Sequence, residues 1–141
     1  MTRLIAVGLL LLSLAATFAS AQTRVNDKDI AAMMNNLKSD TNLFRSAFNT
    51  SVKKSTIRKT SKEKDSKALV QSFDNQVQAM QRTFKEKETA DAQVSIVMNS
   101  GGQIDQLVRT VSFDDRTNTI WAKVKTELNQ LATAYGVPPI N

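Results

Sequence analysis

The chain has 141 residues, contains no histidine and no cysteine, and carries a formal net charge of +6 at pH 7. The absence of histidine removes the commonest metal ligand and the usual general base near neutral pH. The absence of cysteine removes thiolate nucleophiles, disulfide scaffolds, zinc ribbons and covalently attached haem. The composition therefore argues against an enzyme and against a bound cofactor, and we expect neither.

The first residues have the pattern of an export signal. Arg3 supplies a positive charge, and residues 4–16 form an apolar run that is too short to span a bilayer. The small residues Ala19 and Ala21 then flank Ser20 in the form that signal peptidase requires. We predict a signal peptide at residues 1–21, cleaved after Ala21.

The remaining residues, 22–141, have the length of one compact domain, and no second apolar run long enough to cross a membrane follows the signal. The predicted signal makes this an exported protein, periplasmic or secreted. A domain this small in an extracellular eukaryotic protein would be expected to contain cysteines, so their absence favours the bacterial cell envelope.

Apolar residues recur at alternating steps of three and four residues in separate stretches of the mature chain. This spacing places the apolar side chains on one face of a helix, whereas a strand requires strict alternation. The sets are Ile30, Met34, Leu37, Thr41, Phe44, Phe48 and Val52; Val70, Phe73, Val77, Met80 and Phe84; Val94, Val97, Gly101, Ile104, Val108 and Val111; and Trp121, Val124, Leu128, Leu131 and Tyr135.

We call these four sets of residues the apolar stripes. They predict helices near residues 27–55, 61–87, 90–111 and 114–135. Because the connections between them are short, sequential helices must run antiparallel. The sequence therefore predicts an all-α fold, an antiparallel up-and-down four-helix bundle that follows a cleaved signal peptide.

Polar residues at the predicted helix starts indicate how the first two helices are capped. Asn26 or Asp27 can cap the first helix. Thr60 followed by Glu63 has the spacing of a capping box for the second.

The later boundaries carry similar signals. Thr89 or Asp91 can open the third helix, and Ser112 followed by Asp115 resembles another capping box. Gly136 stands where a left-handed residue would end the last helix.

Two adjacent glycines, Gly101 and Gly102, interrupt the predicted third helix. Each costs about 1 kcal/mol relative to alanine in a helix interior. We favour close approach of a bulky neighbour such as Trp121 or Phe44 as the reason, and a kink or hinge is the alternative.

Short motifs along the mature chain resemble those of a known group of proteins. They are Val25-Asn26-Asp27, the Leu37…Asp40-Thr41…Phe44-Arg45 stretch, Phe73-Asp74 with Phe84, Ile104-Asp105, and a final helix with Trp121, Leu128 and Leu131-Ala132-Thr133-Ala134-Tyr135. On these motifs the chain resembles a group of small, uncharacterised, exported bacterial helical proteins. The resemblance covers nearly the whole mature chain and implies a helical fold and export, but no activity.

The stretch from Lys53 to Lys67 concentrates the positive charge of the mature chain. Its net charge is +5, whereas residues 22–52 sum to +1 and residues 68–141 to −1. Ile57 is the only apolar residue between Val52 and Ala68, so we expect this stretch to stay outside the core. Its basic residues are Lys53, Lys54, Arg58, Lys59, Lys62, Lys64 and Lys67. We call residues 53–67 the basic tip.

The basic tip has two interpretations. It is either a solvated connection that keeps the protein soluble, or a surface that docks electrostatically to an anionic part of the cell envelope. Lipid headgroups, lipopolysaccharide and acidic polymers are the anionic candidates. Nucleic acid is not expected as a partner, because no aromatic residue lies among the lysines to stack on bases.

The functional hypothesis is a non-enzymatic cell-envelope protein that binds or scaffolds through the basic tip. The alternative is a periplasmic chaperone-like or stress protein that binds unfolded clients through an apolar face. Self-association stays open, because a stripe-bearing bundle can pair through leftover apolar residues such as Ile96 or Ile120.

Overall fold

A computed structural model describes residues 26–141, which form four α-helices and one short 3-10 helix. The α-helices are α1 (Asp27–Ser51), α2 (Ser61–Lys85), α3 (Asp91–Thr110) and α4 (Asp115–Tyr135). The 3-10 helix η1 (Val52–Lys54) continues from the end of α1. All four predicted helices are confirmed, with ends that agree to within about one turn. The predicted signal peptide, residues 1–21, lies outside the described residues.

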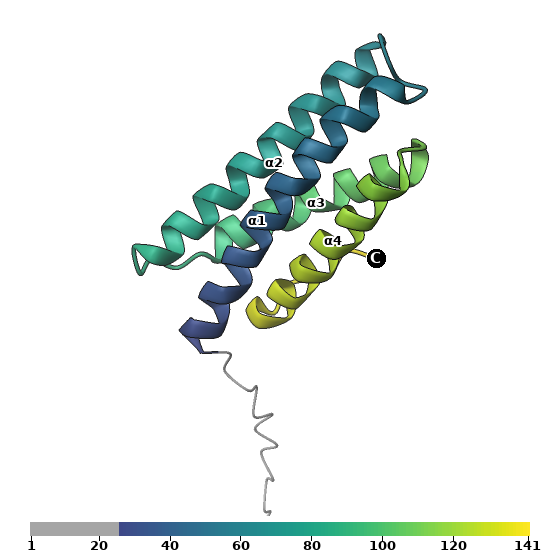
Figure 1. Cartoon of the computed structure of the whole chain (residues 1–141). Helices are drawn as coiled ribbons and strands as arrows, with labels where there is room; N and C mark the ends of the chain where they lie inside the picture. The colour runs from purple at the N-terminus through teal and green to yellow at the C-terminus, as the bar shows by residue number, and fades with distance from the viewer. Residues whose placement is uncertain (1–25) are drawn as a thin grey trace, which may run out of the picture.

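The helices pack as an antiparallel bundle (Figure 1). α1 packs against α2 and α4, and α3 packs against the same two helices, so the four close into a ring. The predicted all-α four-helix bundle is confirmed. Within residues 26–141, no helix is both long enough and apolar enough to cross a membrane.

The two halves of the bundle differ in length. α1 and α2 have 25 residues each, whereas α3 has 20 and α4 has 21. The α1–α2 connection therefore extends past the α3–α4 connection at the same end of the molecule, as Figure 1 shows. This difference in length leaves the α1–α2 connection protruding from the bundle.

The predicted apolar stripes form the core. Most of their members are buried, and the half-buried ones are Ile30, Phe84, Val108 and Tyr135. The indole of Trp121 lies among them, with its ring centroid 5.0 Å from that of Phe44 and 6.0 Å from that of Phe73. Burial of a large apolar side chain stabilises the fold by about 1.5–3 kcal/mol. Three helices thus meet at one aromatic side chain.

A buried aspartate, Asp74, links α1 to α2. Its side chain is fully buried, and its Oδ2 lies 2.7 Å from Nη1 of Arg45. The amide of Gln78 also donates to Oδ2, at 3.2 Å. Because a buried carboxylate without partners would be strongly unfavourable, this pair fixes how α1 and α2 align along their length.

A second buried aspartate, Asp105, links α3 to α4. Trp121 Nε1 donates to Asp105 Oδ1 at 2.9 Å, and Lys125 Nζ lies 3.2 Å from Oδ2. Arg109, one turn along α3, places its Nε 2.9 Å from the same Oδ2. The aspartate therefore satisfies the polar atom of the central indole and holds two cations at the edge of the core.

The first two predicted N-caps are confirmed. The Asn26 side chain accepts a hydrogen bond from the N–H of Asp29 at 2.9 Å, and Thr60 Oγ1 accepts from the N–H of Glu63 at 3.3 Å. At the other end of the chain, Gly136 ends α4 with φ +65°, as predicted. This left-handed conformation is strained for residues with a Cβ, which explains the glycine.

α3 begins at Asp91, one of its two predicted first residues, but no side chain caps it, because the cap position holds Ala90, which is buried in the core. The predicted capping box of α4 is wrong. Asp114, not Ser112, caps α4, with its Oδ1 accepting from the N–H of Thr117 at 2.7 Å. The helix begins later than expected because Phe113 packs on Phe48, with ring centroids 5.3 Å apart.

The paired glycines of α3 have different environments. A Cβ built on Gly101 would lie 2.9 Å from the terminal methyl groups of Ile140 and Leu128, whereas one on Gly102 would meet nothing within 4 Å. Close approach at Gly101 is therefore confirmed. Its partners are residues from the chain end and α4 rather than the predicted Trp121 and Phe44, and α3 continues through both glycines.

Alanine substitution at these two positions should separate helix propensity from packing. We expect Gly102→Ala to stabilise the protein by about 1 kcal/mol, because it adds helix propensity without a clash. We expect Gly101→Ala to be less stable than Gly102→Ala, because two methyl groups must move. Urea unfolding followed by circular dichroism measures both values, and a Gly101→Ala protein at least as stable as Gly102→Ala would contradict the packing argument.

Candidate anionic-surface site

The structure places the basic residues of the tip on three consecutive segments. Lys53 and Lys54 lie in η1, Arg58 and Lys59 in the connection, and Lys62, Lys64 and Lys67 in the first two turns of α2. Six of the seven side chains are exposed, and Lys67 is half-buried. The predicted cluster is thus gathered at one end of the bundle.

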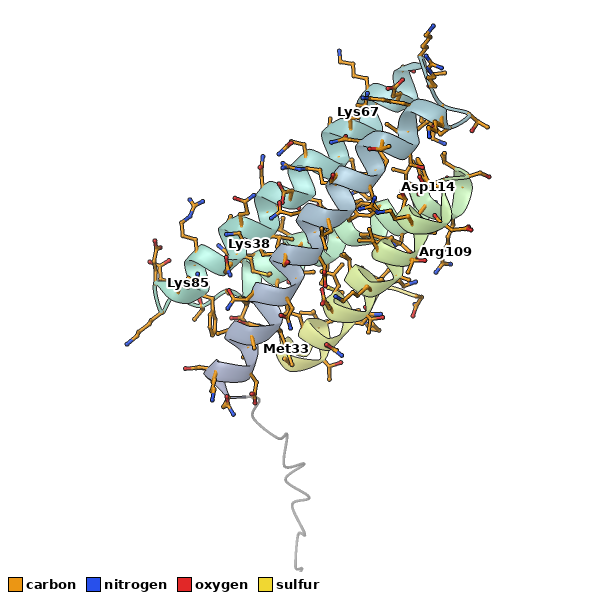
Figure 2. The ribbon with its side chains drawn as sticks, viewed as in Figure 1. Met33, Lys38, Lys67, Lys85, Arg109 and Asp114 are labelled. Carbon is orange, nitrogen blue, oxygen red and sulfur yellow. The ribbon has the colours of Figure 1, made fainter. Side chains whose placement is uncertain are left out.

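The position of the tip at the protruding end gives it access to a flat surface. Figure 2 labels Lys67 near this end of α2 and Lys85 at the opposite end of the same helix. The α3–α4 connection, on which Asp114 is labelled, stops short of the α1–α2 connection in this view (Figure 2). A planar anionic surface would therefore meet the lysines before it met the acidic start of α4.

The tip is anchored to the core through Ile57, contrary to the sequence expectation. This side chain is 7% exposed and belongs to the hydrophobic cluster. Main-chain hydrogen bonds hold the turn on both sides of Ile57. The N–H of Ser55 donates to the C=O of Val52, and the N–H of Thr60 donates to the C=O of Ile57. The connection is therefore a folded turn that displays its lysines.

The carboxylate of Glu63 holds the second half of this turn. Its Oε2 accepts from the N–H of Lys59 at 2.6 Å, and its Oε1 lies 2.5 Å from Nζ of Lys67. Lys59 has φ +62°, a conformation that costs energy for a residue with a side chain. The Glu63 hydrogen bond offsets that cost, and it replaces the reciprocal bond to the Thr60 N–H that a capping box would contain.

These contacts also affect the charge state of Glu63. Hydrogen bonds from Lys67 and from the Lys59 main chain hold the pKa of Glu63 below its usual value. The carboxylate therefore stays ionised, and continues to hold the turn, at a pH lower than that at which a free glutamate is protonated.

A further contact ties the base of the tip to the other half of the bundle. The N–H of Asp114 donates to Oγ of Ser51 at 2.9 Å. Hydrogen bonds from Thr117, another from Ser51 and the nearby charge of Lys54 lower the pKa of Asp114. Asp114 therefore stays ionised as the cap of α4 and provides a negative charge behind the tip.

Replacing Glu63 by alanine should loosen the tip without unfolding the bundle. The Lys59 N–H loses its acceptor, so we expect its amide hydrogen exchange to accelerate by at least tenfold. Exchange in the middle of α1 should stay unchanged, because the core does not depend on this contact. NMR-detected exchange measures both, and unchanged protection of Lys59 would contradict the role assigned to Glu63.

A second polar cluster, which the sequence did not predict, lies between α1 and α4. Asp40 is 5% exposed, and its Oδ2 lies 2.8 Å from Nζ of Lys123. Glu127 is hydrogen-bonded to the same Asp40 carboxyl group. Its Oε2 is buried without an assigned donor or acceptor. Two carboxyl groups and one ammonium group thus share a partly buried site.

This arrangement gives Glu127 an unusual pKa of about 7, because burial, the hydrogen bond to Asp40 and the negative charge of Asp40 all favour its protonated form. Burial also opposes ionisation of Asp40, but hydrogen bonds with Lys123 and Glu127 outweigh that effect and lower its pKa. Below about pH 7 Glu127 therefore carries the proton of the pair and donates it in the hydrogen bond to Asp40.

The raised pKa of Glu127 predicts a pH dependence of stability. The folded state retains a proton that the unfolded chain releases near pH 4.5, so this contribution is complete below pH 4.5 and is lost as the pH rises through about 7. We expect urea unfolding to show lower stability at pH 8 than at pH 5. Glu127→Gln, which is permanently neutral, should reduce that difference, whereas the exposed control Glu86→Gln should not. An equal pH difference in all three proteins would contradict the shared proton.

Comparison with known proteins adds no assignment: no family model, no curated protein and no solved structure matches the chain. The resemblance to exported bacterial helical proteins therefore stays a prediction. Among residues 26–141, no group of three or more potential ligand side chains is placed to hold a metal ion.

The polar groups that sequence reasoning missed share one feature. Asp40, Asp74 and Asp105 each stand next to a stripe residue in the sequence, at the edge of the buried face. A carboxylate at such a position, combined with a basic residue at the edge of another stripe, is the signal that would have indicated an interhelical pair. The partner could not be chosen from the sequence, because that requires the alignment of the helices.

Proposed function

We propose that the protein is an exported, non-enzymatic component of the cell envelope that binds or scaffolds at an anionic surface through its basic tip. The observation that supports this proposal is the presentation of six exposed basic side chains on a folded turn at the protruding end of the bundle. A flexible connection could be equally basic, but it would lose more entropy on binding.

The charge distribution supports the same proposal. The net charge of +5 on residues 53–67 contrasts with −1 on residues 68–141, so the excess positive charge is concentrated at the α1–α2 connection. Near an anionic membrane each lysine or arginine contributes about 1 kcal/mol, and the attraction falls off within a Debye length of roughly 8–10 Å. Protrusion past the α3–α4 connection keeps the acidic residues at the start of α4 further from the surface.

The chaperone-like alternative requires an extended exposed apolar face. Among the described residues, the large apolar side chains that are exposed are Leu43 on α1, at 49%, and Ile96 on α3, at 51%. They lie on helices that do not pack against each other. Isolated apolar residues are normal on soluble proteins, so electrostatic docking is the better supported proposal.

Binding to lipid vesicles tests the proposal directly. We expect the protein to sediment with vesicles that contain phosphatidylglycerol and not with pure phosphatidylcholine, and binding should weaken steeply between about 50 and 500 mM salt. Replacing Lys53, Lys54, Lys59, Lys62 and Lys64 by glutamine should weaken binding on the order of a hundredfold or more.

The matched control removes the same charge from positions on α1, on α2 and just after α2 that lie away from the tip. It replaces Lys28, Lys38, Arg82, Lys85 and Lys87 by glutamine, and we expect it to keep most of the vesicle binding. Circular dichroism confirms that both variants are folded. Binding that survives in the tip variant, or that falls equally in the two variants, would contradict docking through the tip.

A further inference from the structure

The residues after α4 fold back along the bundle instead of leaving it. In Figure 1 the C-terminus lies beside the middle of α4, away from the end at which that helix stops. Residues 137–141, which we call the tail, follow the left-handed Gly136 and lie against α3. Val137 and Ile140 are half-buried in the tail, and its other residues are exposed.

One side chain of α4 holds the main chain of the tail. Asn129 Oδ1 accepts from the N–H of Ile140 at 2.8 Å, and Asn129 Nδ2 donates to the C=O of the same residue at 3.0 Å. Both main-chain groups of one residue are therefore paired with one amide. The contact is made with main-chain groups alone, and it excludes proline at this position because proline has no N–H.

The side chain of Ile140 packs over Gly101, in a position that we call the Gly101 seat. The terminal methyl of Ile140 lies 2.9 Å from the position that a Cβ would occupy on Gly101, beside Leu128 and near Phe73. Only a glycine at position 101 leaves room for that methyl without displacement. On the far side, Arg109 donates to the main-chain oxygen of Asn141. The seat therefore combines an aliphatic contact with three main-chain hydrogen bonds.

The tail fills only part of the groove. A volume of about 610 Å³ remains open between it and α3. Met98 and the tail prolines give this space apolar walls, whereas Asn99, Gln103 and Gln106 supply amide groups along α3. Gly102 also lines it, with nothing within 4 Å of the position of a Cβ. Grooves of this size hold small ligands or short peptide segments.

We propose that this groove binds an extended peptide segment of another protein, with a branched aliphatic side chain in the Gly101 seat, and that the tail is its resident, displaceable occupant. The tail itself demonstrates the chemistry that the groove accepts. The open space beside the prolines admits larger side chains than the tail provides, and the amides of α3 can pair with further main-chain groups. This site lies on α3 and α4 and is independent of the basic tip.

The attached tail competes with any incoming segment. A segment on a short linker has an effective concentration in the millimolar range, so the tail keeps weak ligands out of the groove. Loosening the tail should therefore expose the site. Ile140→Asp does so, because it places a charge in the apolar seat while leaving α4 and its cap intact.

The test uses a fluorescent peptide with the sequence of residues 136–141. Fluorescence anisotropy should show saturable binding to the full-length Ile140→Asp protein, with a Kd on the order of 0.1–1 mM, and at least tenfold weaker binding to the wild-type chain. The same peptide carrying aspartate in place of isoleucine should not bind. Asn129→Ala in the Ile140→Asp background should weaken binding at least tenfold.

A second peptide tests the open space. With both prolines replaced by leucine, it should bind the Ile140→Asp protein several-fold more tightly, and Gly102→Leu should remove that gain by filling the space. Ala68→Leu, on exposed α2 surface, is the matched control. Should circular dichroism show that Ile140→Asp unfolds the protein, Ile140→Ala replaces it. The proposal would be overturned if the peptide showed no saturable binding up to about 5 mM, or if Asn129→Ala left its affinity unchanged.

Discussion

Mutual burial of four narrow apolar stripes holds this bundle together. Each stripe covers only one face of its helix, so no helix can remove its apolar residues from water alone. The ring of packed neighbours, with Trp121 between Phe44 and Phe73, meets that requirement for the whole bundle. The protruding tip and the tail groove are both built on helices that this burial holds in place.

Burial of the stripes does not by itself set the axial position of one helix relative to its neighbour. The buried aspartates set that position. Asp74 pairs with Arg45 across α1 and α2, and Asp105 pairs with Trp121 across α3 and α4. A shift of one helical turn would leave a buried carboxylate without its partner, which costs several kcal/mol. These four residues also belong to the short motifs that the sequence analysis singled out, so those motifs have a structural explanation in interhelical pairing.

The two proposed binding surfaces use the bundle in different ways. The basic tip depends on the extra length of α1 and α2 and on Ile57, which ties the turn to the core, whereas Glu63 holds its left-handed residue. The groove depends on the paired glycines of α3, one seating Ile140 and the other leaving open space. One surface acts through long-range charge and the other through short-range shape and main-chain hydrogen bonds, so the two can act independently.

Patterns along the chain are enough to predict the helical class, the four helices and most of the buried apolar residues, because three- and four-residue spacing is a local property of a helix. The same reading locates the basic tip, since charge is additive along the chain. Contacts between distant parts of the chain supply the rest: Ile57 anchors the tip, Asp40 lies against Lys123 and Glu127, and Ile140 explains Gly101. Each of these contacts joins residues whose proximity depends on how helices and connections align in space, and hydrophobic periodicity carries no information about that alignment.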